Sequence, residues 1–185
     1  MEFKAVPVTL TMRGYKDVKE LMYEAFPPNQ LFPLNTITMW AKRKGVDFLA
    51  FYDDGELFGT VFMMQDEEYA YVLYLAVKDG LRSKGYGSKI LEFVEQKAEG
   101  KLIFLDVEEP DRLALNNTQR KNRIKFYHKH GIVDAGYTFT EDQDTYRILC
   151  ADPDKFDPEE ASHMISNLSF GMYSVNLKKA ERLSI

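Results

Sequence analysis

The chain has 185 residues, of which 45% are hydrophobic and 14% aromatic, enough to bury one core of ordinary size. Its formal net charge of −5 disfavours a nucleic-acid-binding protein, because such proteins usually present a basic face. A single cysteine excludes an internal disulfide, and three scattered histidines give no zinc-binding spacing, so we expect no metal. The sequence shows no basic leader and no apolar run approaching about 18 residues, so we expect a cytoplasmic protein that does not enter a membrane.

The first half of the chain alternates between strand and helix patterns. Apolar residues that alternate with polar ones predict strands, and apolar residues that recur at a spacing of three and four predict helices. Prolines mark where helices end. In chain order the patterns give a strand at residues 3–10, a helix at 15–25, a short helix at 36–44, and strands at 47–52, 57–65 and 69–77. The turn Asp53-Asp54-Gly55-Glu56 predicts that the two strands beside it form a hairpin. The last of these strands is almost continuously apolar, which is typical of a strand buried on both faces.

The second half continues this alternation. In chain order it gives a helix with Ile90, Leu91, Val94 and Ala98 on one side, a strand at residues 101–107, a helix at 118–130, and strands at 132–140 and 145–150. Asp157 and Pro158 begin a final helix, with a carboxylate at the N-cap and proline at the first position. We expect this helix to dock on the domain, although a lid over a binding site stays open, and residues beyond Gly171 to fray. The elements together predict a mixed sheet with helices on both faces.

The segment from Leu75 to Ser88 leads from the end of an apolar strand through an Arg-x-x-Gly-x-Gly turn into a helix. The unpaired N–H groups and the dipole at a helix N-terminus bind anions. We expect Gly85 and Gly87 to take up positive φ and to let a ligand approach the backbone, while Arg82 and Lys84 add positive charge. The segment therefore predicts a pyrophosphate site.

Two other phosphate-binding motifs do not fit this segment. Tyr86 and Gly87 stand where a P-loop needs lysine followed by serine or threonine. Ile90 stands where the dinucleotide-binding motif needs its third glycine. A glycine turn that binds no ligand is the remaining alternative.

A second motif lies downstream. Phe126 and Tyr127 end a predicted helix and are followed by Gly131 and the apolar Ile132. This aromatic pair, together with the Arg82-x-x-Gly85-x-Gly87 loop upstream and a strand between the two, resembles the GNAT superfamily of N-acetyltransferases, which bind acyl-CoA. The resemblance extends over residues 3–150 and is strongest over 69–137.

The resemblance implies an α/β (α+β) fold with a mixed, mostly antiparallel central sheet, splayed parallel middle strands and helices on both faces. It implies one acyl-CoA-dependent acetyltransferase domain at residues 1–150, with residues 151–185 as a C-terminal helical extension of the same domain. It also implies acetyl-CoA as a cosubstrate and no metal. The backbone of Leu75, Ala76 and Val77 would hold the pantetheine arm and polarise the thioester carbonyl. The residues expected at the pyrophosphate are Arg82, Ser83, Lys84, Gly85, Tyr86, Gly87 and Ser88.

The same resemblance implies that Tyr127 is the general acid. A hydroxyl with an ordinary pKa of about 10 is protonated at pH 7 and can donate to the departing CoA sulfur. A buried tyrosine that only anchors its helix is the alternative. Some family members carry a catalytic glutamate on the strand before the phosphate loop, but Tyr71 stands at that position here. Asp106 and Glu108 alternate onto one face of the next strand, and we rank Glu108 first as the base or as the anion that holds the acceptor ammonium.

The helix before the aromatic pair departs from the family in one more place. Many members carry an asparagine seven residues before the tyrosine, whereas this chain has Arg120. The charged run at residues 120–125 is expected to be a solvated helix face, and contact with the 3′-phosphate of CoA is the alternative.

The overall expectation is transfer of an acetyl group from acetyl-CoA to a primary amine, by direct attack in a ternary complex. The acceptor is expected to be a small molecule or a peptide, with no nucleic acid and no membrane involved, and homodimer formation is left open. The alternative is a catalytically weak acyl-CoA-binding regulatory domain.

Overall fold

The computed structural model describes residues 3–183 as a mixed α/β fold whose sheet is mostly antiparallel and has one parallel pair. The strands are β1 (Phe3–Pro7), β2 (Val46–Asp53), β3 (Glu56–Gln65), β4 (Tyr69–Val77), β5 (Leu102–Glu108), β6 (Val133–Glu141), β7 (Asp144–Cys150) and β8 (Lys178–Lys179). The helices are α1 (Tyr15–Ala25), α2 (Leu34–Trp40), α3 (Tyr86–Ala98), α4 (Asn117–Lys129) and α5 (Pro158–Leu168). The strands are hydrogen-bonded in the order β1-β2-β3-β4-β5-β7-β6-β8, which confirms the predicted fold class.

The chain forms two compact units. The first contains residues 3–65 and 72–99, and the second contains residues 66–71 and 100–183. Strand β4 therefore contributes its first three residues to the second unit and the remainder to the first. Within residues 3–183, no helix has the length and apolar character needed to cross a membrane.

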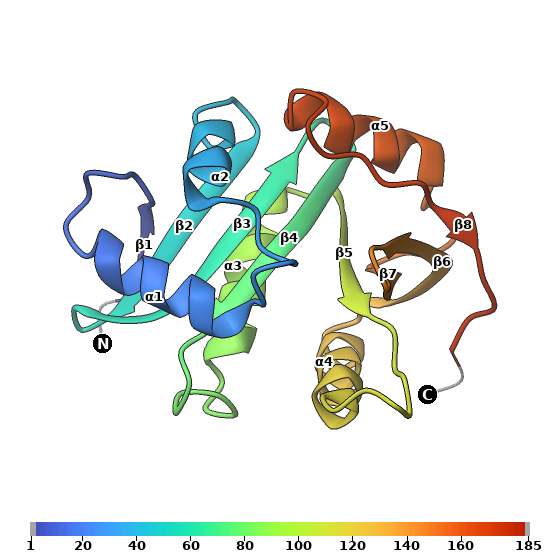
Figure 1. Cartoon of the computed structure of the whole chain (residues 1–185). Helices are drawn as coiled ribbons and strands as arrows, with labels where there is room; N and C mark the ends of the chain where they lie inside the picture. The colour runs from blue at the N-terminus through green and yellow to red at the C-terminus, as the bar shows by residue number, and fades with distance from the viewer. Residues whose placement is uncertain (1–2, 184–185) are drawn as a thin grey trace. The chain divides into compact units, whose positions relative to one another are not determined.

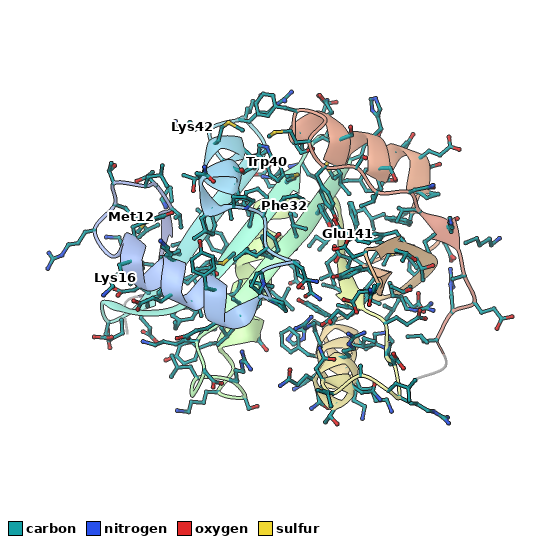
Figure 2. All side chains as sticks on the ribbon, viewed as in Figure 1. Met12, Lys16, Phe32, Trp40, Lys42 and Glu141 are labelled. Atoms are coloured by element: carbon teal, nitrogen blue, oxygen red, sulfur yellow. The ribbon has the colours of Figure 1, made fainter. Side chains whose placement is uncertain are left out.

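In the first unit, helices cover both faces of the strands, with α1 and α2 on one face and α3 on the other (Figure 1). The β2–β3 hairpin closes between Asp53 and Glu56, as the sequence predicts. Trp40 of α2 is fully buried, and its ring lies 5.1 Å from that of Phe32 and 6.2 Å from that of Phe62, measured between centroids. Figure 2 shows the side chains of Phe32 and Trp40 close together in this core. The aromatic residues of the first unit thus form much of its interior.

Gly59 of β3 lies where α3 meets the sheet. A Cβ atom at this position would come within 2.6 Å of Cδ1 of Ile90 in α3 and within 2.7 Å of the Ala76 carbonyl oxygen in β4. Real Cβ atoms do not approach other atoms this closely, so only glycine fits without a shift of the backbone or of α3.

Several boundaries in the first unit differ from the predicted ones. Helix α1 spans the predicted residues, but β1 ends at Pro7 instead of residue 10, because the chain turns where Met12 N–H donates to Thr9 O. Helix α2 begins at Leu34, directly after Pro33, and ends at Trp40 instead of residue 44. A proline just before a helix has a favourable fixed φ, and this start is earlier than the apolar pattern alone indicates.

The second unit contains β5, β7, β6 and β8 with helices α4 and α5. Strands β5 and β7 are antiparallel and place Asp106 opposite Ile148 and Glu108 opposite Tyr146. At the start of β5, Leu102 N–H donates to Glu68 O at 2.8 Å. Helix α5 begins as predicted, because the Asp157 carboxylate accepts hydrogen bonds from Glu159 N–H and Glu160 N–H at 2.8 and 3.0 Å.

The residues beyond Gly171 were expected to fray, and this expectation is wrong for the part of the chain that the structure describes. Tyr173 and Val175 are buried, and β8 pairs with β6 through Tyr137 and Thr138. Further along, Leu183 N–H donates to the buried Asp134 carboxylate at 2.7 Å. No pattern in the chain indicates this pairing, because β8 has only two residues and no apolar alternation.

Candidate functional site

The predicted phosphate loop lies in the first unit, at the beginning of α3. Gly85 is the N-cap residue of α3 and has φ +85°, so this position favours glycine. Among residues 3–183, no side chain caps the N-terminus of α3. The N–H groups of its first turn are therefore oriented as an anion site requires.

The side chains of the loop differ in how they are held. Arg82 is exposed and makes a long ion pair of 3.7 Å with Asp79, a contact that a ligand can displace at little cost. The Tyr86 hydroxyl donates to Asp53 Oδ2 at 3.2 Å, and its ring lies 4.5 Å from that of Phe58. Tyr86 thereby fixes the first turn of α3 to the β2–β3 hairpin.

Gly87 does not have the conformation expected from the sequence. It lies inside α3 and is not among the residues with positive φ, whereas Gly85 is. The prediction of positive φ is right for Gly85 and wrong for Gly87. Helix α3 begins one residue before Gly87. The role of Gly87 would therefore be to leave space for a ligand, because its backbone has no unusual angle.

The three strand residues expected at the pantetheine arm end β4 in the same unit. Ala76 is buried, while Leu75 and Val77 are half-buried. Directly after them, Lys78 N–H donates to Phe58 O at 2.8 Å, which holds the end of β4 beside β3. All the predicted cofactor-binding residues therefore lie in the first unit, from the end of β4 to the first turn of α3.

The predicted catalytic residues lie in the second unit, where the structure adds a contact. Tyr71 is fully buried and donates a short hydrogen bond to Asp106 Oδ1. Its ring stacks on Phe104 with centroids 4.8 Å apart. Tyr71 stands where the resemblance leads one to look for a glutamate, and the carboxylate that it contacts comes from β5.

Asp106 has an unusual proton affinity for an aspartate. Its pKa is raised from 3.8 to about 6, mainly because the carboxyl is buried, and the negative charge of Glu141 contributes to this rise. The hydrogen bond from Tyr71 and the positive charge of Arg123 act in the opposite direction, since both stabilise the carboxylate. Figure 2 labels Glu141, at the end of β6. Asp106 is half-buried and remains mostly ionised at pH 7.

Tyr127 projects from α4 and is 6% exposed. The pKa of its hydroxyl is raised to about 12, mainly because the group is buried; Arg123 lowers the pKa and Asp106 raises it. No side-chain hydrogen bond within residues 3–183 engages this hydroxyl. The alternative, a buried tyrosine that only anchors its helix, stays open, because the ring is buried. The arrangement can present a protonated hydroxyl near an ionised carboxylate.

Glu108, ranked first from the sequence, is already engaged with cations. Its carboxylate pairs with Arg120 at 2.9 Å and with Arg123 at 3.4 Å, and it accepts a bond from Asn116 at 3.2 Å. Arg120 also pairs with Asp144 at 3.0 Å and is buried. The expectation that residues 120–125 form a solvated helix face is wrong for Arg120. This side chain is buried because it pairs with Glu108 of β5 and Asp144 of β7. These contacts favour Asp106 over Glu108 as the group that can meet an amine.

Tyr146 and Tyr173 lie in the same cluster and are not predicted from the sequence. Burial raises the pKa of the Tyr146 hydroxyl, and Asp144 and Asp106 raise it further. Tyr173 lies close enough to Tyr71 to help raise the pKa of the Tyr71 hydroxyl. The alternation of β7 could have indicated Tyr146, but no pattern in the sequence links Tyr173 to this cluster.

Two further observations bear on what the second unit can bind. Glu67 and Glu68 line a cavity of about 660 Å³ together with Glu159, Glu160 and His163. In the part of the chain that the structure describes, no group of three or more His, Cys, Asp or Glu side chains could hold a metal ion.

Comparisons with known proteins agree with the fold. The chain is similar to a GNAT-family acetyltransferase from Bacteroides thetaiotaomicron, with 25% identity, a TM-score of 0.70, and coverage of 94% of this chain and 100% of that one. A GNAT acetyltransferase from Elizabethkingia anophelis, solved with acetyl-CoA bound, has 15% identity and a TM-score of 0.58 over 81% of this chain and 97% of that one.

The ribosomal-protein-S18-alanine N-acetyltransferase from Escherichia coli shares the fold at 14% identity and a TM-score of 0.59, over 80% of this chain and 92% of that one. No curated protein matches the sequence. The family model described as Acetyltransferase (GNAT) family matches residues 15–132, which include the phosphate loop, Asp106 and Tyr127. The chain therefore belongs to the GNAT family of acetyltransferases.

Proposed function

We propose that this protein is an N-acetyltransferase that moves the acetyl group of acetyl-CoA to a primary amine. The observation that carries the proposal is the pair formed by Asp106 and Tyr127. One is a carboxyl whose pKa of about 6 leaves it mostly ionised at pH 7, and the other is a hydroxyl whose pKa of about 12 leaves it protonated. An amine acylation needs an anion for the ammonium and a donor for the thiolate, and these two groups have those properties.

Acetyl-CoA binding is assigned to the first unit. The uncapped N-terminus of α3 and the αL conformation of Gly85 support a pyrophosphate at residues 82–88, with Arg82 and Lys84 supplying charge. The backbone of Leu75, Ala76 and Val77 would take the pantetheine arm. Acetyl-CoA supplies the activated acyl group, and the residues supply position and proton transfer.

The proposed reaction is direct attack in a ternary complex. The ammonium of the acceptor is held by Asp106 and gives up a proton to it, directly or through water. The amine nitrogen then forms a bond to the carbonyl carbon, and the carbon–sulfur bond breaks. The products are an acetylated amine and CoA, and one proton is released to solvent.

The pKa of Tyr127 limits what its hydroxyl does in this step. A thiol has an ordinary pKa of about 8.5, so full proton transfer from a hydroxyl at about 12 to the leaving thiolate is uphill by roughly 5 kcal/mol. The hydroxyl is therefore assigned to donate a hydrogen bond that stabilises the thiolate, and solvent completes the protonation. This role still requires the proton on Tyr127 at working pH.

The alternative, a regulatory domain that binds acyl-CoA without turnover, was supported by the lack of a glutamate at Tyr71. The carboxylate of Asp106, hydrogen-bonded to Tyr71, weakens that argument. We propose a cationic acceptor, either a small molecule or a peptide terminus or lysine, since the chain carries a net charge of −5 and an amine is cationic at pH 7. We also retain residues 1–150 as the catalytic domain and residues 151–185 as its extension.

Two measurements test the proposal. The first is binding of CoA and acetyl-CoA by calorimetry and thermal shift, where ligand at 100 times Kd should stabilise the fold by about 2.7 kcal/mol. The second is acetyl-CoA consumption over a library of amines, with product identified by mass. Absence of binding at millimolar CoA overturns the proposal, and binding without turnover on any amine class favours the regulatory alternative.

A further inference from the structure

We propose that Tyr71 is a positioning residue for Asp106: its hydroxyl holds one oxygen of the carboxylate, so that the other oxygen can accept a hydrogen bond from the acceptor ammonium. Both residues belong to the second unit. The inference deepens the proposed function, and it rests on that function where it gives Asp106 a role in the reaction.

Tyr71 reaches the carboxylate from a fixed position. Its side chain is 1% exposed, and its ring stacks on Phe104 of β5 with 4.8 Å between centroids. Phe104 is itself fully buried, and its ring lies 5.4 Å from that of Phe156. Side chains two residues apart on a strand share a face, so Asp106 follows Phe104 on the face that Tyr71 contacts. There the Tyr71 hydroxyl makes a short hydrogen bond to Asp106 Oδ1.

The direction of this hydrogen bond follows from the chemistry of the two groups. An ionised carboxylate has no proton to give, so the Tyr71 hydroxyl is the donor. Such a bond makes the hydroxyl hold its proton more tightly and the carboxyl hold its proton less tightly. Both effects are present. Burial raises the pKa of Tyr71 most, and contact with Asp106 raises it too. Burial also raises the pKa of Asp106, and the bond from Tyr71 partly offsets that rise.

The two acids on this face of β5 differ in what they leave for a ligand. Glu108 uses both of its carboxylate oxygens, with Oε1 paired to Arg120 and Oε2 paired to Arg123. Among residues 3–183, Tyr71 is the only side chain that hydrogen-bonds or ion-pairs with Asp106. Oδ2 of Asp106 can therefore receive an ammonium while Oδ1 keeps its bond to Tyr71, and the carboxylate does not have to rotate.

Several charged or titratable groups face Asp106 from the elements around it. Arg123 of α4 favours the carboxylate, while Glu141, at the end of β6, disfavours it. The remaining groups are Tyr127 of α4, Tyr146 of β7, Glu108 of the same strand, and Tyr173 beside Tyr71. Of the effects that favour ionisation, the bond from Tyr71 is the largest, so its loss should raise the pKa of Asp106.

The test is the titration of the Asp106 side-chain carboxyl by ¹³C NMR, assigned with Asp106→Asn. This measurement requires no acceptor and no turnover. Tyr71→Phe keeps the ring that stacks on Phe104 and removes the hydrogen-bond donor. The midpoint of Asp106 in this variant should rise by about one unit, which is the scale on which a hydrogen bond to a charged group contributes.

Tyr69→Phe is the matched control. The Tyr69 ring lies 5.8 Å from that of Phe104, measured between centroids, but its hydroxyl bonds to Asp157 N–H at 3.1 Å and to Glu160 at 3.5 Å. Removal of this hydroxyl perturbs the same aromatic cluster and leaves the bond to Asp106 in place. The midpoint should therefore stay at the wild-type value.

A measurement on the wild type covers the case in which Tyr71→Phe does not fold. The hydroxyl proton of Tyr71, assigned through its own ring protons, should change its ¹H shift with the midpoint of Asp106, because the two groups share one hydrogen bond. A hydroxyl proton that does not respond to this titration overturns the inference. An unchanged midpoint in folded Tyr71→Phe, or an equal shift in Tyr69→Phe, overturns it as well.

Activity separates the inference from the proposed function. With an acceptor from the amine library, the acidic limb of kcat/KM in Tyr71→Phe should move upward with the NMR midpoint. Activity that is low at pH 7 should then recover at higher pH, whereas Asp106→Asn should stay low at every pH. A limb that stays fixed while the midpoint moves would remove Asp106 from the reaction, and the inference then falls together with that part of the proposed function. An unchanged midpoint overturns the inference alone.

Discussion

Replacing Asp106 with asparagine is expected to stabilise the fold at neutral pH while it lowers activity. The carboxyl has a pKa of about 6 in the folded protein and 3.8 when unperturbed. Between these values the unfolded chain has released its proton while the folded chain still holds it. The free energy of unfolding contributed by this group therefore falls as pH rises from about 4 to about 6, the reverse of the usual behaviour of a salt-bridged aspartate.

The size of the effect follows from the two pKa values. A difference of about two units, at 1.36 kcal/mol per unit, corresponds to a loss of about 3 kcal/mol above pH 6, as an upper bound. Asparagine carries no charge and can still accept the hydrogen bond from Tyr71, so Asp106→Asn avoids this loss. For a protein of this size, about 3 kcal/mol corresponds to an increase in Tm of roughly 6–12 °C.

The assay compares the Tm of wild type and variant by scanning calorimetry from pH 4 to pH 8. The advantage of Asp106→Asn should be small at pH 4, grow up to pH 6 and stay constant above pH 7. Glu108→Gln is the control, because loss of its pairs with Arg120 and Arg123 should destabilise the protein by about 2 kcal/mol or more. A difference in Tm that is flat or falls with pH would refute the reasoning, since it would mean that Tyr71 and Arg123 stabilise the carboxylate more than burial destabilises it.

Three further results are expected. Tyr127→Phe should lower kcat by about 10²–10³-fold, as expected for loss of one hydrogen-bond donor to a developing anion, with little change in acetyl-CoA binding. A near-normal kcat with a lowered Tm would instead assign Tyr127 a structural role. Gly85→Ala should weaken CoA binding measured by calorimetry, because alanine is strained at φ +85° by about 1 kcal/mol or more. Gly55→Ala has the same strain at φ +85° outside the phosphate loop and is the control, and equal affinity in Gly85→Ala would remove Gly85 from the site. The kcat/KM of the wild-type enzyme should fall below about pH 6 as Asp106 takes up its proton, and an acidic limb near pH 4 would contradict this assignment.

Much of the fold could be predicted because local signals were strong. The helix of residues 15–25 has a clear apolar stripe and ends before prolines, and the start of α5 at Asp157 follows directly from capping chemistry. The phosphate loop could be located because its glycine spacing is itself a local signal. The conformation of Gly87 could not be predicted, because the glycine spacing does not show at which residue the helix begins. Since α3 begins at Tyr86, Gly87 lies inside the helix.

The residue types of the candidate site could be predicted, but their contacts could not, because these contacts connect segments that are distant in the sequence. Asp106 and Glu108 look equivalent on one strand, and only their partners distinguish them: Arg120 and Arg123 for Glu108, and Tyr71 for Asp106. These partners come from a helix and another strand, so no spacing along the chain reveals them. The burial of Arg120 has the same origin, since a charged residue is hidden only when the fold supplies carboxylates around it.

The glycine at the contact between β3 and α3 also links the core of the first unit to its ligand chemistry. Gly59 touches no phosphate, yet the absence of its side chain sets how close Ile90, and with it the whole of α3, can come to the sheet. A side chain at position 59 as small as a methyl group would displace α3. The first turn of α3 would then move too, and so would the N–H groups that are assigned to the pyrophosphate. Substitution of Gly59 should then change cosubstrate affinity, although the residue lies in the interior. A smaller side chain at position 90 would relieve the contact with Ile90 but not the contact with the Ala76 carbonyl oxygen.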